Sequence, residues 1–292
     1  MFRAADPNGQ FMVFSVCPGR WYGYRVNLSL AELAGGEYNT FVGKFMFLLS
    51  GRGRMDIKKL NTNDYNNWIK EQLSLLAEPK FQQFTAKLLP GVTDILGVRL
   101  PLLRQMAKQL AKGDWKAYLS HALDSSYEEI MLQGMALGYA KGGLQEKREY
   151  LQAFIPKINN WSVCDSACSA IKLAEQQPEE FWDFLMPYLD SKKEFQVRFV
   201  LVQLLDYYVN AAYLGRVLDA VQQAGQGGYY ANMAQAWAVS ICYREFPEET
   251  LPFLKENSLN DFTHNKAIQK ITESLKVPEE KKEIARRMKR QG

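Results

Sequence analysis

Residues 130–138 read Ile130-Met131-Leu132-Gln133-Gly134-Met135-Ala136-Leu137-Gly138, and this stretch decides the fold class. Its apolar and small residues recur at steps of three and four, which places them on one face of an α-helix. A half-buried strand would alternate at every second residue instead. The same helical spacing returns further along the chain, at Phe195, Phe199, Val202 and Leu205. The pattern predicts helices that bury one face.

Helix follows helix from Asn61 to the end of the chain, separated by short breaks that often contain Gly or Pro. Pairs of helices recur about every 35 to 40 residues, near the period of helical solenoid repeats. We therefore predict an all-α fold, a solenoid of two-helix repeats (an α-α superhelix) whose concave face carries a binding site. The expected helix starts lie near Thr62 or Asn63, Pro79, Pro101, Asp114, Ser126, Gln145, Ser162, Pro178, Glu194, Ala212, Tyr229, Pro247, Asn260 and Pro278.

Residues 1–54 differ from the remainder of the chain. They hold 8 of the 20 glycines and show no sustained helical or alternating period. We predict that they are a poorly ordered extension or the product of a misassigned start, and that residues 55–292 form the helical domain. The alternative is a short strand or hairpin at residues 11–14 and 21–26.

The overall composition is that of a globular protein, with 47% hydrophobic and 23% charged residues. The formal net charge is +4. Residues 1–54 contribute +3 of it, which leaves +1 for the following 238 residues. Affinity for nucleic acid must therefore come from the local arrangement of charge. No apolar run reaches the length of a membrane span.

The four cysteines are too few for a disulfide framework in a chain of 292 residues. A reducing cytoplasm is the expected location. Cys164 and Cys168 share a helix face, but neither of the two histidines lies near them in sequence, so we predict buried thiols and no metal site.

Trp161 precedes Asp165 by four residues, so the indole and the carboxylate share one face of the expected helix. An aromatic plane beside a fixed negative charge can stabilise a positively charged transition state. The alternative is structural. Ser162 and Asp165 form an [ST]-x-x-[DE] pattern, in which Ser162 caps the helix and Asp165 bonds back to it.

A resemblance to a known family rests on a longer set of motifs. Residues 95–104, Ile-Leu-Gly-Val-Arg-Leu-Pro-Leu-Leu-Arg, and the following Met106-Ala107-Lys108 resemble a conserved helix start of the DNA alkylation repair protein family. That family consists of HEAT-like-repeat glycosylases that act on alkylated purines in DNA. The resemblance spans about residues 60–275. Its remaining matches, in chain order, are Trp161, Asp165, Arg198 and Trp237.

The resemblance implies a HEAT-like solenoid that hydrolyses the N-glycosidic bond of N3- or N7-alkylated purines in duplex DNA. Asp165 takes the place of the family's catalytic carboxylate, and Trp161 and Trp237 match its aromatic residues at the lesion. Arg198 falls where the family has an arginine that faces the DNA backbone. Such a reaction needs no cofactor, and we expect a monomer.

The chemistry is consistent with these residue types. An alkylated purine is already cationic, so the base leaves as a neutral molecule and positive charge moves onto the deoxyribose. The enzyme then needs a fixed carboxylate near the sugar and a positioned water, not a strong acid. A helix N-terminus would favour the ionised form of Asp165, and indole faces attract cations.

Each of these residues also has a structural interpretation. On residue pattern alone, Trp237 belongs to the helix core, and Arg198 pairs at the surface with Glu194 four residues earlier. Arg99 and Arg104 are either phosphate contacts or part of a solvated face. The basic run at residues 281–290 either contacts phosphates or complements a helix dipole, and we favour the dipole.

Two other functions compete with the glycosylase. The first is a catalytically silent family member that binds DNA without excising a base. The second is a HEAT-like scaffold for protein partners. Basic side chains gathered around Asp165 would favour the enzyme, whereas an acidic or apolar surface there would favour a scaffold.

Overall fold

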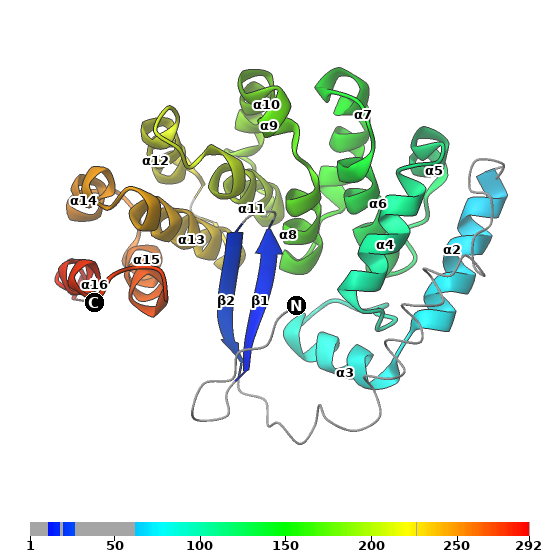
Figure 1. Ribbon diagram of the computed structural model, residues 1–292, viewed down its shortest axis with the longest axis horizontal. Coiled ribbons are helices and arrows are strands. Elements are labelled where there is room, and N and C mark those ends of the chain that lie inside the picture. Colours follow the sequence, from blue (N-terminus) through cyan, green and yellow to red (C-terminus); the bar gives the residue numbers. More distant parts are fainter. Residues whose placement is uncertain (1–10, 18–19, 27–61, 226, 292) are drawn as a thin grey trace. The chain divides into compact units, whose positions relative to one another are not determined.

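The structure is a computed structural model that describes residues 11–17, 20–26, 62–225 and 227–291. The backbone alone is described for the first two segments and for residues 62–64. The chain divides into two compact units, residues 1–141 and 142–292 (Figure 1). The helical region that the sequence groups into one domain from residue 55 is thus shared between both units. The boundary at residue 55 stays a prediction.

The first unit begins with an antiparallel hairpin. Strand β1 (Phe11–Cys17) pairs with β2 (Arg20–Val26), with Phe11 opposite Val26 and Cys17 opposite Arg20. This is the hairpin that the sequence offered as the alternative for the N-terminal segment. The predicted poorly ordered extension or misassigned start concerns residues 1–54, most of which lie outside the described residues.

The helices of the first unit follow the predicted starts closely. Pro101 occupies the first turn of its helix, where the missing N–H needs no partner. The apolar face of that helix packs against the helix containing residues 130–138, the stretch that first indicated the fold. The bounds are α2 (Thr62–Leu76), α3 (Pro79–Leu88), α4 (Leu100–Leu110), α5 (Trp115–His121) and α6 (Tyr127–Tyr139).

A buried carboxylate holds the loop that precedes α4. Glu128 of α6 accepts hydrogen bonds from the backbone N–H groups of Leu96 (3.0 Å), Gly97 (2.7 Å) and Val98 (3.2 Å). Gly97 has a φ of +90°, a conformation that favours glycine. The geometry of this loop therefore accounts for the glycine of the Leu96-Gly97-Val98 motif.

The second unit is a stack of helices. Helix α8 packs on α11, α11 packs on α13, and α13 packs on α15 (Figure 1). Helices α12 and α14 lie against α13, and α16 lies against α15. The helices are α7 (Leu144–Phe154), α8 (Trp161–Ala170), α9 (Leu173–Gln176), α10 (Pro178–Leu185), α11 (Glu194–Gln203), α12 (Leu214–Gln223), α13 (Tyr229–Glu245), α14 (Pro247–Lys255), α15 (Asp261–Glu273) and α16 (Glu279–Arg286). Shorter turns are the 3-10 helices η3 (Ile155–Lys157) and η4 (Met186–Tyr188) and the π-helix η5 (Leu204–Tyr208).

This stacking confirms the predicted fold class, an all-α solenoid of two-helix repeats, with the N-terminal hairpin as the exception. Each inner helix buries side chains against the preceding and following ones, as repeat proteins do. The short α9 and the π-helical turn η5 were not predicted. No helix in the described part of the chain is long and apolar enough to cross a membrane. Cys164 and Cys168 are buried free thiols, as expected, and Cys242 is a third.

Candidate functional site

The cap of helix α8 lies two residues earlier than the Ser162 cap considered from the sequence, and this changes the role of Asp165. The cap is Asn160, whose side-chain oxygen accepts a hydrogen bond from the Val163 N–H at 3.0 Å. The predicted capping box of Ser162 and Asp165 is therefore wrong. Asp165 is the fifth residue of α8, beyond the N-terminal positions where an acidic side chain usually serves the helix end.

Asp165 is instead bound to Arg198 on the neighbouring helix α11. The Arg198 Nε donates to Oδ1 at 3.0 Å and Nη2 donates to Oδ2 at 2.9 Å. The two side chains are only 13% (Asp165) and 7% (Arg198) exposed. Two parallel bonds between a guanidinium and a carboxylate fix both groups in position. The third nitrogen of Arg198, Nη1, donates to the Tyr230 carbonyl at 3.0 Å, so this single side chain connects α8, α11 and α13.

The predicted surface pair between Arg198 and Glu194 is wrong, because Glu194 serves a different helix. Its carboxylate accepts hydrogen bonds from the backbone N–H groups of Tyr230 and Ala231 at the N-terminus of α13, the latter at 3.3 Å. Gly228 makes this possible. Its φ is +99°, and a Cβ there would lie 2.3 Å from the Glu194 carboxylate. Glu194 thus fixes the start of α13, which in turn places the carbonyl that Arg198 contacts.

Lys270 of α15 belongs to the same cluster, and the sequence did not identify it. Burial, assisted by the nearby positive charge of Arg198, lowers the pKa of Lys270 to about 8, while Glu273 and Asp165 oppose the shift. A lysine that loses its proton near neutral pH is unusual. Nothing in its local sequence distinguishes Lys270 from a surface lysine, since Arg198 and Asp165 come from other helices.

The two indoles lie in different surroundings. Trp161 is half-buried, one turn before Asp165 on α8. Trp237 is 5% exposed and lies on α13 between α11 and α15. Little of the Trp237 ring therefore faces solvent. This agrees with the alternative that the residue pattern suggested, in which Trp237 belongs to the helix core. The catalytic roles of both residues stay predictions.

The sequence comparison identifies the family. The profile described as DNA alkylation repair enzyme matches residues 69–271, more than two thirds of the chain. The chain belongs to this family. The match confirms the resemblance drawn from the motifs and contains the whole Asp165 cluster. A search of curated proteins and a search of solved structures each found no match.

Membership in the DNA alkylation repair family supports a role in DNA repair and makes DNA the expected partner. The family match extends over both compact units, from α2 to α15. The candidate site of this family member consists of Asp165, Arg198 and Lys270, which three different helices contribute. Trp161 and Tyr230 border it through their positions on α8 and α13.

The two other predicted DNA contacts belong to the first unit. Arg99 is paired with Glu78 through an Nη2–Oε2 distance of 2.8 Å, and its guanidinium lies 4.9 Å from the centre of the Phe81 ring. Arg104 is half-buried near Tyr139. Burial raises the pKa of Tyr139, and the positive charge of Arg104 opposes that rise. Contact with DNA by either arginine stays a prediction.

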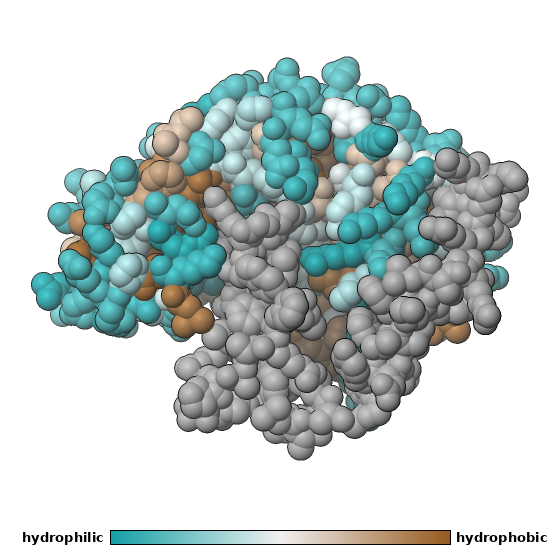
Figure 2. Space-filling view, in the orientation of Figure 1, coloured by the Kyte–Doolittle hydropathy of each residue, from teal (hydrophilic) through white to brown (hydrophobic). Residues whose placement is uncertain are grey.

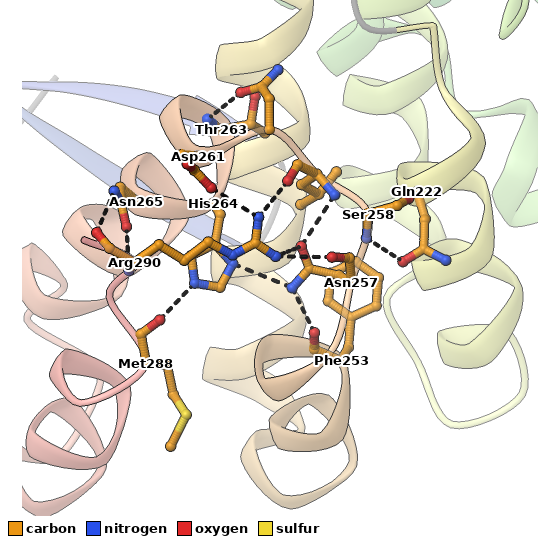
Figure 3. A network of polar contacts seen from close by, with 12 residues as sticks. Gln222, Phe253, Asn257, Ser258, Asp261, Thr263, His264, Asn265, Met288 and Arg290 are labelled. Carbon is orange, nitrogen blue, oxygen red and sulfur yellow. Dashed lines mark hydrogen bonds and ion pairs between the residues drawn. The ribbon is translucent and has the colours of Figure 1, made fainter. Parts of the chain in front are cut away.

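The basic C-terminal run is largely occupied within the protein. Arg290 donates to the carbonyls of Asn257 (2.8 Å) and Leu259 (2.5 Å) and contacts Asp261 (Figure 3). His264 bonds to the Met288 carbonyl beside it at 2.8 Å (Figure 3). The end of the chain is thereby attached to the loop before α15. This anchoring role was not among the predictions for the run, which were phosphate contact and a helix dipole.

Proposed function

We propose that this protein hydrolyses the N-glycosidic bond of N3- or N7-alkylated purines in duplex DNA. The observation that carries the proposal is the carboxylate of Asp165, held by Arg198 in a polar cluster that remains partly open to solvent. The family match supports DNA repair as the setting. The bond and the substrate are our inference from the chemistry of the cluster.

The reaction requires charge stabilisation more than proton transfer. The alkylated base is cationic before cleavage and neutral after it leaves, so the positive charge passes to the deoxyribose. A carboxylate fixed near the sugar lowers the energy of that oxocarbenium ion, and it needs no reorganisation when the charge develops. We assign this role to Asp165, because the two bonds from Arg198 hold its carboxylate in one orientation.

Asp165 also retains hydrogen-bonding capacity for a nucleophile. A carboxylate has about four lone-pair sites, and Arg198 occupies one on each oxygen. The remaining sites can accept a hydrogen bond from water. A water held there would be oriented towards the anomeric carbon of the sugar, and its proton would move towards the carboxylate as the new C–O bond forms.

Arg198 and Lys270 supply the positive charge that DNA requires. The cluster carries one carboxylate and two cationic side chains when Lys270 is protonated, so its net charge attracts phosphate. The guanidinium of Arg198 donates to Asp165 and to the Tyr230 carbonyl. A backbone phosphate would be attracted to this positive charge while the two bonds from Arg198 keep the carboxylate of Asp165 in place.

The proposal is tested by base release. Duplex DNA that contains a single 7-methylguanine is incubated with the protein, and free base is measured under single-turnover conditions. The expected result is release of 7-methylguanine and none of unmodified guanine from a matched duplex. A folded protein that binds the damaged duplex and releases no base would contradict the proposal.

A second candidate is a family member that binds DNA without excision. It is favoured by two observations: Arg198 contacts both oxygens of Asp165, and Trp237 is 5% exposed. The same assay separates the two candidates, because a silent member binds the damaged duplex and leaves its glycosidic bonds intact.

A further inference from the structure

Four aromatic rings form a continuous strip across the N-terminal ends of the alternate helices α11, α13 and α15 of the second unit. Phe195 of α11 lies 5.2 Å from Tyr230 of α13, measured between ring centres. Tyr230 lies 5.3 Å from its neighbour Tyr229, and Tyr229 lies 5.9 Å from Phe262 of α15. We call these residues the aromatic strip. Its origin is the stacking of the helices, because the four residues belong to three segments of the sequence.

The outer half of the aromatic strip faces solvent. Tyr229 is 56% exposed and Phe262 is 42% exposed. Few large hydrophobic side chains in the described part of the chain are this exposed, and these two contact each other. In the view of Figure 2, hydrophobic patches on the second unit lie among hydrophilic surface. Adjacent exposed rings indicate a binding surface, whereas single ones do not.

Lysines border the aromatic strip at both ends. Lys192 and Lys193 immediately precede α11 and are exposed. At the other end, Phe262 lines a hollow of about 590 Å³ together with Lys266 and Lys289. Asp261 is the one carboxylate in that lining, and Arg290 pairs with it. The surface therefore offers stacking faces in the middle and positive charge on either side.

The aromatic strip is joined to the candidate site. The Tyr230 carbonyl accepts the hydrogen bond from Arg198, the residue that holds Asp165. We propose that the aromatic strip binds unpaired nucleotides of a DNA single strand, with bases on the rings and phosphates on the flanking lysines. Every base has a π-face, so such binding is independent of sequence. In the interior of a duplex the base faces are covered by their neighbours and cannot stack on Tyr229 or Phe262.

Charge decides between this ligand and a protein partner. The centre of a protein–protein interface is usually depleted of lysine, whereas a single-strand channel combines aromatic faces with positive charge that follows the backbone. The aromatic strip has the second composition. This binding activity goes beyond base excision and does not require it, since it needs neither a lesion nor Asp165.

The test is the affinity of the full chain for a fluorescent oligothymidylate, measured by anisotropy, with a blunt undamaged duplex for comparison. The double variant Tyr229→Ala/Phe262→Ala is expected to bind the oligothymidylate at least about tenfold more weakly than the parent, because two rings on which bases stack are lost. Leu275→Ala is the matched control, since Leu275 is an exposed apolar side chain (78%) outside the aromatic strip. Its affinity should equal that of the parent.

Salt dependence separates stacking from charge. Loss of the two rings should leave the slope of log affinity against log salt unchanged, whereas Lys192→Met/Lys193→Met should reduce it. The proposal is overturned if the parent does not bind the oligothymidylate, or if the double aromatic variant binds as tightly as the parent. It is also overturned if Leu275→Ala loses as much affinity. No lesion is present, so failure here leaves the excision proposal standing, and the reverse holds too.

Discussion

Glu128 in the first unit and Asp165 in the second are both acidic side chains that join one helix to a segment about thirty residues away. Glu128 accepts three backbone N–H groups from the loop before α4 and is fully buried. Asp165 accepts two bonds from one flexible side chain, Arg198, and is 13% exposed. The partners of Glu128 are backbone groups, whereas the partner of Asp165 is a single side chain.

The comparison teaches how a structural carboxylate differs from a functional one. Burial raises the pKa of the Glu128 carboxyl, although its three backbone hydrogen bonds oppose that rise. Such a group stabilises a loop and cannot reach a ligand. Asp165 has some solvent exposure and a cationic side chain as its partner. We propose that this second arrangement acts on DNA.

The largest expected effect is on stability at Glu128. Glu128→Ala leaves three buried N–H groups without their acceptor, and each such group costs about 1–3 kcal/mol. We expect the free energy of unfolding to fall by about 3–5 kcal/mol, measured by urea denaturation. A loss under about 1 kcal/mol would show that water replaces the carboxylate and that the loop does not depend on it.

The loop itself offers the next test. Gly97→Ala places a Cβ 2.6 Å from the Glu78 carbonyl oxygen and 2.7 Å from the Gln82 nitrogen, at a φ of +90°. We expect a loss of more than about 2 kcal/mol in unfolding free energy. Gly91→Ala is the control, because Gly91 has a similar φ of +85° and no atom within 4 Å of the new Cβ. Equal losses at both positions would mean that backbone strain alone sets the cost.

A double-mutant cycle measures the Asp165–Arg198 pair. Because the pair is largely buried, Asp165→Asn and Arg198→Gln should show a coupling energy of about 1–3 kcal/mol in unfolding free energy. The exposed pair Arg216–Glu179, with an Nη1–Oε2 distance of 2.9 Å, should show a smaller coupling. If the losses of unfolding free energy at Asp165 and Arg198 are additive, the two side chains are not coupled. Arg198 would then not position the Asp165 carboxylate.

A separate effect is the pH dependence of stability that Lys270 causes. Its pKa is about 8 in the folded protein, below the ordinary value of 10.5. Between these values the unfolded chain binds the proton and the folded protein does not, so the contribution of Lys270 to stability rises with pH from about 8 to 10.5. The stability of the parent relative to Lys270→Met should therefore increase over that interval. The same comparison with exposed Lys276→Met should show no trend.

Much of the fold could be predicted because helix boundaries are local. Asp114, Ser126 and Asn260 cap their helices where expected, and Ser126 with Glu129 forms a capping box. The same pattern failed at Ser162 and Asp165. Asn160, two residues earlier, caps α8 instead. The sequence pattern does not decide which of two nearby residues, Asn160 or Ser162, caps the helix, because the choice depends on how the helix packs.

Less of the candidate site could be predicted. The family motif identified Asp165 and Arg198 separately, but their bond joins residues 33 positions apart on different helices. Local spacing instead suggested Glu194 as the partner of Arg198. Lys270 gave no signal, since its lowered pKa comes from burial and from Arg198, 72 positions earlier in the chain. Such contacts arise from the stacking of repeats, which a single sequence does not specify.

The central claim is that the carboxylate of Asp165 stabilises the positive charge formed during base release. The most direct measurement is the single-turnover rate of 7-methylguanine excision by Asp165→Asn, with exposed Asp183→Asn as the control. We predict that Asp165→Asn is folded and excises about a hundredfold more slowly, equivalent to about 3 kcal/mol, while Asp183→Asn matches the parent. Excision by Asp165→Asn at the parental rate would contradict the claim and leave Asp165 as the structural partner of Arg198.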